Sequence, residues 1–104
     1  MLTDEQREAE ISKLGGDALY LKGRWGEVIL KPPAPADWEF YLAAQQNPAA
    51  KTVATHALIR SMIAYPSKDE YDALRKRYVA LSEGIAKTPA FDRFIGLEVE
   101  ATEK

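Results

Sequence analysis

Apolar and polar residues alternate clearly over one stretch of this chain, residues 17–31, and the alternation predicts a β-hairpin. The alternating apolar positions are Leu19, Leu21, Val28 and Leu30. Between the two runs, Gly23-Arg24-Trp25-Gly26 supplies the glycines that a tight turn favours. Because a lone hairpin is only marginally stable in water, we expect it to pack against helices.

A short polar helix is predicted before the hairpin, within residues 1–16. Thr3 and Gln6 have the spacing of a capping box, in which each side chain bonds the backbone of the other residue. Gly15-Gly16 marks the end of this helix, because glycine readily adopts the left-handed conformation that ends helices.

Two helices are predicted after a connector stiffened by Pro32, Pro33 and Pro35, residues that disfavour both strand and helix. The first runs from about Ala36 to Gln46, and its apolar side chains are Trp38, Tyr41 and Leu42. The second runs from about Ala49 to Ala64, and its apolar stripe comprises Val53, Ala54, Ala57, Leu58 and Met62, widened by Ile59 and Ile63. A stripe this wide indicates contact on more than one side of the helix.

The last third of the chain begins with a second capping box, Ser67 and Glu70, after Tyr65-Pro66 ends the preceding helix. Apolar side chains then keep a spacing of three to four residues, which allows one helix over 68–87: Tyr71, Leu74, Tyr78, Leu81 and Ile85. Thr88-Pro89 has the pattern of an N-cap and a first helical residue, and the short helix that follows would carry Phe91, Phe94 and Ile95.

Together these elements predict an α+β fold that is mainly helical, with four to five helices and one N-terminal β-hairpin. The length of 104 residues fits a single domain. Its expected parts are an N-terminal helix (1–16), the hairpin (17–31), a helical part (36–96) and a flexible acidic tail (97–104).

The composition excludes several classes of chemistry. There is no cysteine, which excludes disulfides, thiolate nucleophiles and cysteine metal sites and fits a cytoplasmic protein. A net charge of -2 gives no overall field to attract nucleic acid or an anionic membrane. The acidic N-terminal segment is unlike a signal peptide, and no apolar run approaches the roughly 20 residues that cross a bilayer.

No group of residues in the sequence predicts catalysis. His56 is the only histidine and has no second ligand at helical spacing, so a structural role is expected. Asp69, Glu70 and Asp72 fall in the first turn of a predicted helix, where the helix dipole favours negative charge. We therefore expect no catalytic, cofactor-binding or metal-binding residue, no cofactor and no enzymatic activity.

Two features raise the question of a binding surface. The basic run Arg75-Lys76-Arg77 could contact nucleic acid, but three successive residues point to different sides of a helix, so nucleic-acid binding is not expected. Trp25 at the hairpin tip is a candidate protein contact, with folding back over the core as the alternative. Trp38 and Tyr41 are expected to pack their helix against the hairpin, with a binding role as the alternative.

The order of elements and three short motifs resemble the tail assembly chaperones of long-tailed bacteriophages and prophages. The motifs are the connector Lys31-Pro32-Pro33, the helix opening Asp37-Trp38-Glu39, and the join Tyr65-Pro66-Ser67-Lys68-Asp69-Glu70-Tyr71. The resemblance covers about Ile11 to Ile95. The family pattern has a proline-containing break before its last helices, where this chain has Tyr78-Val79 instead.

The resemblance implies a non-enzymatic protein of the host cell cytoplasm that binds the tape-measure protein, a long, largely helical chain with exposed apolar faces. It would keep that protein soluble until the tail tube polymerises around it. The tail tube protein and a second copy of the chain are the other partners considered, and no membrane is expected to bind. We expect a partner helix to dock on Trp25 and on the stripe Leu58, Ile59, Met62 and Ile63.

Two other classes of function stay open at this point. One is a small regulatory or nucleic-acid-binding module of a mobile element, and the other is an enzyme. The genes beside the coding sequence would separate the first from a tail assembly chaperone, because a tail tube gene upstream and a very long gene downstream accompany the chaperone.

Overall fold

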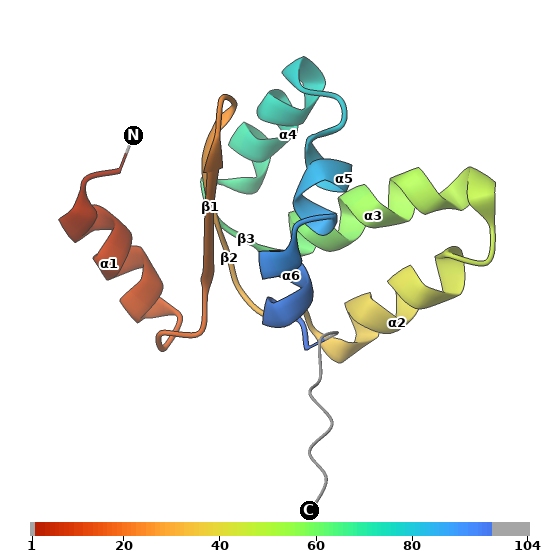
Figure 1. The fold of residues 1–104 in the computed structure, drawn as a ribbon, viewed down its shortest axis with the longest axis horizontal. Helices are drawn as coiled ribbons and strands as arrows, with labels where there is room; N and C mark the ends of the chain where they lie inside the picture. Colours follow the sequence, from red (N-terminus) through yellow and green to blue (C-terminus); the bar gives the residue numbers. More distant parts are fainter. Residues whose placement is uncertain (1, 97–104) are drawn as a thin grey trace, which may run out of the picture.

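The computed structural model describes residues 2–96, and within them the chain forms six helices and a three-stranded antiparallel sheet (Figure 1). In chain order these are α1 (Asp4–Lys13), β1 (Leu19–Gly23), β2 (Gly26–Leu30), α2 (Pro35–Ala44), α3 (Pro48–Met62), β3 (Ile63–Tyr65), α4 (Lys68–Arg77), α5 (Leu81–Ala86) and α6 (Pro89–Phe94). The fold is α+β and mainly helical, as the sequence predicts. The predicted tail, 97–104, lies outside the described residues.

The predicted hairpin is confirmed, and its two glycines have different roles. β1 and β2 pair antiparallel with Gly23 opposite Gly26, so Arg24 and Trp25 form the tip. Gly26 has a φ of 120°, a backbone conformation that residues other than glycine rarely adopt. A Cβ at Gly23 would lie 2.6 Å from Nε1 of Trp25, so glycine lets the indole ring lie across the strand.

A third strand, β3, is the main element that the sequence analysis missed. Ile29 and Leu30 of β2 pair with Tyr65 and Ile63, so the sheet order is β1-β2-β3. The predicted helix to Ala64 therefore ends at Met62, because the chain becomes extended at Ile63 (φ -66°, ψ 119°) and pairs with the sheet. The three residues are too few to show an alternating pattern.

The sequence allowed one helix over 68–87, but the structure has two, α4 and α5, separated by residues 78–80. The described chain therefore has six helices, where the sequence predicted four to five. Tyr78 ends α4 with a φ of -118° and a ψ of 82°, and its carbonyl accepts a hydrogen bond from the Leu81 backbone N–H (2.9 Å). The turn lets both Tyr71 of α4 and Ile85 of α5 reach the core.

The core forms on one side of the hairpin. Val28 and Leu30 point to this side and are fully buried with side chains of α3, α4, α5 and α6. Helix α1 lies on the other side of the hairpin, and α2 to α6 lie on the core side (Figure 1). Trp38 and Tyr41 stack on each other (5.2 Å between ring centres) and pack against the core, although the main neighbour of α2 is α3 rather than the hairpin.

Helix α1 buries no residue of its own, and polar contacts join its N-terminal part to the hairpin. The carboxylate of Glu27, which is 6% exposed, accepts hydrogen bonds from the Leu2 backbone N–H and the Tyr20 hydroxyl. The Arg7 guanidinium lies over the Tyr20 ring, 4.9 Å from its centre. The hydrogen bonds from Leu2 and Tyr20 hold the pKa of Glu27 below its usual range.

Both predicted capping boxes are present. The Ser67 hydroxyl accepts a hydrogen bond from the Glu70 backbone N–H (3.2 Å), and the Glu70 carboxylate accepts one from the Ser67 backbone N–H (3.4 Å). The Thr88 hydroxyl likewise caps α6, and Pro89 is its first residue, as predicted. The sequence placed Pro35 in the connector, whereas in the structure it is the first residue of α2, a position where a helix tolerates proline.

Replacing Ser67 with alanine is expected to lower the free energy of unfolding by about 0.5–2 kcal/mol, because the start of α4 loses the acceptor for its third backbone N–H. Urea denaturation measures the change. Ser12→Ala on the exposed surface of α1 is the matched control, and we expect it to stay within about 0.5 kcal/mol of the wild type. Equal effects of the two substitutions would show that the cap contributes nothing.

Candidate partner-binding surface

The predicted docking stripe on α3 lies in the core. Leu58, Ile59, Met62 and Ile63 are 3%, 0%, 0% and 4% exposed. The stripe is wide because α2 packs on α3 from one side while α4 and α5 pack on it from another. The prediction that these four side chains receive a partner helix is therefore wrong for this fold, since a partner cannot reach them.

Other apolar side chains that the sequence placed in stripes are exposed instead. Val53 of α3 is 69% exposed, because it lies five residues before Leu58 and so about 140° around the helix from it. Leu42 of α2 is 47% exposed. With Phe40 (65%) and Val79 (74%), these are the large apolar side chains that the described part of the chain leaves to solvent.

Trp25 lies between the two alternatives that the sequence left open. Its ring is half-buried and packs against the core, yet it also lines a groove of about 540 Å³ between the hairpin tip and the α4–α5 turn. We call this the tip groove. Its main apolar lining is Leu21, Trp25, Tyr78, Val79, Leu81 and Ile85.

Basic side chains lie in and beside the tip groove. Lys22 is the charged residue among the described ones that line it. The Arg77 guanidinium lies over the ring of Tyr78, 5.5 Å from its centre, and Arg24 is exposed on the hairpin tip beside Trp25. The groove therefore combines an apolar lining with one cation in its wall, Lys22, and a second, Arg77, on the ring of Tyr78. Arg77 also lines a separate hollow, together with Glu27 and Glu70.

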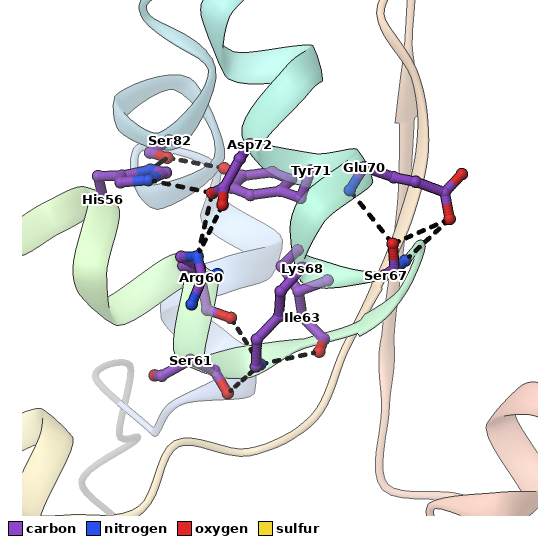
Figure 2. Close-up of polar contacts among 10 residues, drawn as sticks. All are labelled: His56, Arg60, Ser61, Ile63, Ser67, Lys68, Glu70, Tyr71, Asp72 and Ser82. Carbon is purple, nitrogen blue, oxygen red and sulfur yellow. Dashed lines mark hydrogen bonds and ion pairs between the residues drawn. The ribbon is translucent and has the colours of Figure 1, made fainter.

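A polar network joins α3, α4 and α5, and the sequence analysis did not anticipate it (Figure 2). His56 Nδ1 lies 2.9 Å from the Ser82 hydroxyl, which lies 2.7 Å from the Tyr71 hydroxyl. On its other side, His56 Nε2 lies 3.6 Å from Asp72, and Arg60 Nε donates to both Asp72 oxygens (3.0 and 3.1 Å). No spacing rule brings these residues together, because they come from three separate helices.

The network contains a serine, a histidine and an aspartate, the residue types of a hydrolase triad. A nucleophile must be reachable by its substrate, and Ser82 is 0% exposed with its hydroxyl already paired with Tyr71. This burial favours a structural role, in which the network fixes the relative positions of the three helices.

The network also shifts the pKa values of its members. The hydrogen bond from Arg60 holds the pKa of Asp72 below its usual range. Burial raises the pKa of the Tyr71 hydroxyl to about 12. The pKa of His56 is lowered, first by burial and then by the charges of Arg75 and Arg60, against the opposing charges of Asp72 and Glu83.

Stability is expected to fall as the pH drops below the ordinary histidine pKa of 6.5. The folded pKa of His56 is the lower one, so the unfolded chain takes up a proton first and acid favours unfolding. His56 is the only histidine, so His56→Gln should flatten the slope of unfolding free energy between pH 7 and pH 5. Urea denaturation across this range measures it, and a wild-type slope that is flat or rises toward acid would contradict the assignment.

Lys68 ties the start of α4 to the end of α3 (Figure 2). Its ammonium group donates to the carbonyls of Arg60 (2.9 Å), Ile63 (3.4 Å) and Ser61 (3.5 Å). These carbonyls belong to the negative end of the α3 dipole, where a cation is favourable. Burial lowers the pKa of Lys68. The join Tyr65-Pro66-Ser67 is thus held from both sides, by this lysine and by the capping box.

The charged residues that the sequence singled out on α4 have different surroundings in the structure. Asp69 and Glu70 lie in the first turn of α4, as predicted, whereas Asp72 has the specific partner Arg60. Arg75 is half-buried, while Lys76 and Arg77 are exposed. Within residues 2–96, no group of three or more histidine, aspartate or glutamate side chains could hold a metal ion.

Comparisons with family models, with curated proteins and with solved structures found no match to this chain. None of the helices in the described part of the chain combines the length and apolar character needed to span a membrane.

Proposed function

We propose that this protein is a tail assembly chaperone of a long-tailed phage or prophage. It binds the tape-measure protein in the host cell cytoplasm and keeps that long helical chain soluble until the tail tube forms around it. The tail tube protein is a second partner in this proposal. No cofactor is needed, because the protein acts by binding alone.

The observation that carries the proposal is the place of the motifs in the fold. The Lys-Pro-Pro connector joins the hairpin to α2, and the Tyr-Pro-Ser join links the sheet to α4 through a capping box and Lys68. The order of helix, hairpin, connector and helices is the order that the resemblance implies. The apolar side chains that gather in the tip groove, with Val79 74% exposed, support a role in binding another protein.

The experiment is co-expression with the protein encoded by the long gene expected downstream. The proposal predicts that the wild-type chain raises the soluble fraction of that protein, compared with an unrelated protein of similar size. Lys51→Gln, an exposed substitution away from the apolar side chains of the tip groove, should act like the wild type. An unchanged soluble fraction would overturn the proposal.

No nucleic-acid-binding role is proposed beside it. Arg75, Lys76 and Arg77 form the one basic run in the described chain, and they do not share one exposed face. Phosphate binding depends on a clustered positive surface.

A further inference from the structure

We propose that the tip groove binds an acidic amphipathic helix of the partner protein. The inference rests on the proposed function, and it names the segment of the partner that this chain recognises: a helix with an apolar stripe flanked by aspartate and glutamate.

The lining of the groove suits the apolar stripe of a helix. Two aromatic rings, Trp25 and Tyr78, lie with aliphatic side chains from β1 and α5 around a volume of about 540 Å³. Helices that dock in grooves do so through apolar side chains at i, i+3, i+4 and i+7. Val79 contributes an aliphatic side chain that is 74% exposed, the largest exposed fraction among the large apolar residues described.

Gly84 keeps the groove open at a cost to the helix that holds it. It lies inside α5, where glycine is less favourable than alanine by roughly 0.5–1 kcal/mol. A Cβ at this position would meet no atom within 4 Å, and the backbone does not require glycine, since its φ is not in the left-handed region. Neither packing nor backbone geometry explains this glycine, whereas an occupant lying against α5 does.

The charges select an acidic partner. Lys22 lines the groove, and the Arg77 guanidinium lies over the ring of Tyr78, which also lines it. No aspartate or glutamate is among the described residues that line it. By contrast, the exposed apolar residues of α2 and α3 lie in a segment, 40–59, whose only charged residue is Lys51. The tip groove is therefore where an apolar stripe and an acidic flank can both be matched.

Photo-crosslinking in cells that co-express the downstream-encoded tape-measure protein tests the inference. One variant carries p-benzoylphenylalanine in place of Val79 in the groove, and the matched control carries it in place of Val53, which is similarly exposed (69%) but lies on α3. We expect crosslinks from position 79 and not from position 53. Mass spectrometry should place them in a segment with apolar residues at helical spacing and more acidic than basic residues.

Two substitutions separate the charge from the shape of the groove. Lys22→Gln with Arg77→Gln should reduce crosslinking from position 79 by about two- to tenfold, the loss of two exposed ion pairs. Gly84→Leu should block the groove without disturbing the fold, since a Cβ at this position would meet no atom within 4 Å and Gly84 is exposed. Lys51→Gln and Ala57→Leu, both at exposed positions of α3, are the controls and should leave crosslinking unchanged.

The outcomes separate this inference from the proposed function. If the chain solubilises the tape-measure protein but crosslinks equally from both positions, or from position 53 alone, the function stands and the groove is not the site. A crosslink from position 79 to a second copy of the chain, or to a basic segment, overturns the inference as well. If the chain neither solubilises nor crosslinks to the tape-measure protein, both proposals fail.

Discussion

Leu58→Ala is expected to lower the free energy of unfolding by about 2–5 kcal/mol, the range for removing a large buried aliphatic side chain. Leu58 is 3% exposed and lies among the core side chains of β2, α4 and α5. The space left by the removed atoms cannot close fully, because strands and helices from several parts of the chain surround it. Urea denaturation followed by circular dichroism measures the loss.

Val53→Ala is the control for this prediction, because Val53 lies on the same helix and is 69% exposed. It should change the unfolding free energy by no more than about 0.5 kcal/mol. If the two substitutions had similar effects, α3 would be turned the other way around, and the buried stripe would again be available to a partner.

Ser82→Ala is expected to cost about 1–3 kcal/mol, although it removes a single oxygen atom. The Ser82 hydroxyl is the shared partner of Tyr71 and His56, and Tyr71 and Ser82 are both 0% exposed. Without the Ser82 hydroxyl, the Tyr71 hydroxyl stays buried and loses the hydrogen bond that it makes in the wild type. Thermal and urea denaturation would both record the loss.

A double-mutant cycle with Tyr71→Phe isolates this contact. Tyr71→Phe removes the second hydroxyl, so the double variant should lose less stability than the sum of the two single variants. Strict additivity would show that the hydrogen bond between Ser82 and Tyr71 contributes nothing of its own.

The sequence predicted the features that depend on neighbouring residues. The capping boxes at Thr3 and Ser67, the helix stop at Gly15-Gly16 and the hairpin turn each need only a few adjacent positions, and all are present. β3 could not be predicted, because its three residues are extended only where β2 offers an edge to pair with. The break at Tyr78 likewise depends on the core, which draws Tyr71 and Ile85 inward from two helices.

The candidate site shows the same division. An apolar stripe predicts that a helix is covered, but it does not say whether the cover is the protein's own core or a partner. On α3 the cover is the core for Leu58 and Ile59. The tip groove was only partly visible in the sequence, through Trp25, because its other wall comes from residues more than 50 positions away at the α4–α5 turn.

The most direct test of the central claim is the mass of the complex formed with the tape-measure protein. The two proteins would be co-expressed, purified through a tag on this chain and analysed by size-exclusion chromatography with light scattering. We expect one peak that contains both proteins, with a mass equal to a tape-measure chain plus one or more copies of this chain. Elution of this chain alone, with the tape-measure protein left in the insoluble fraction, would contradict the account.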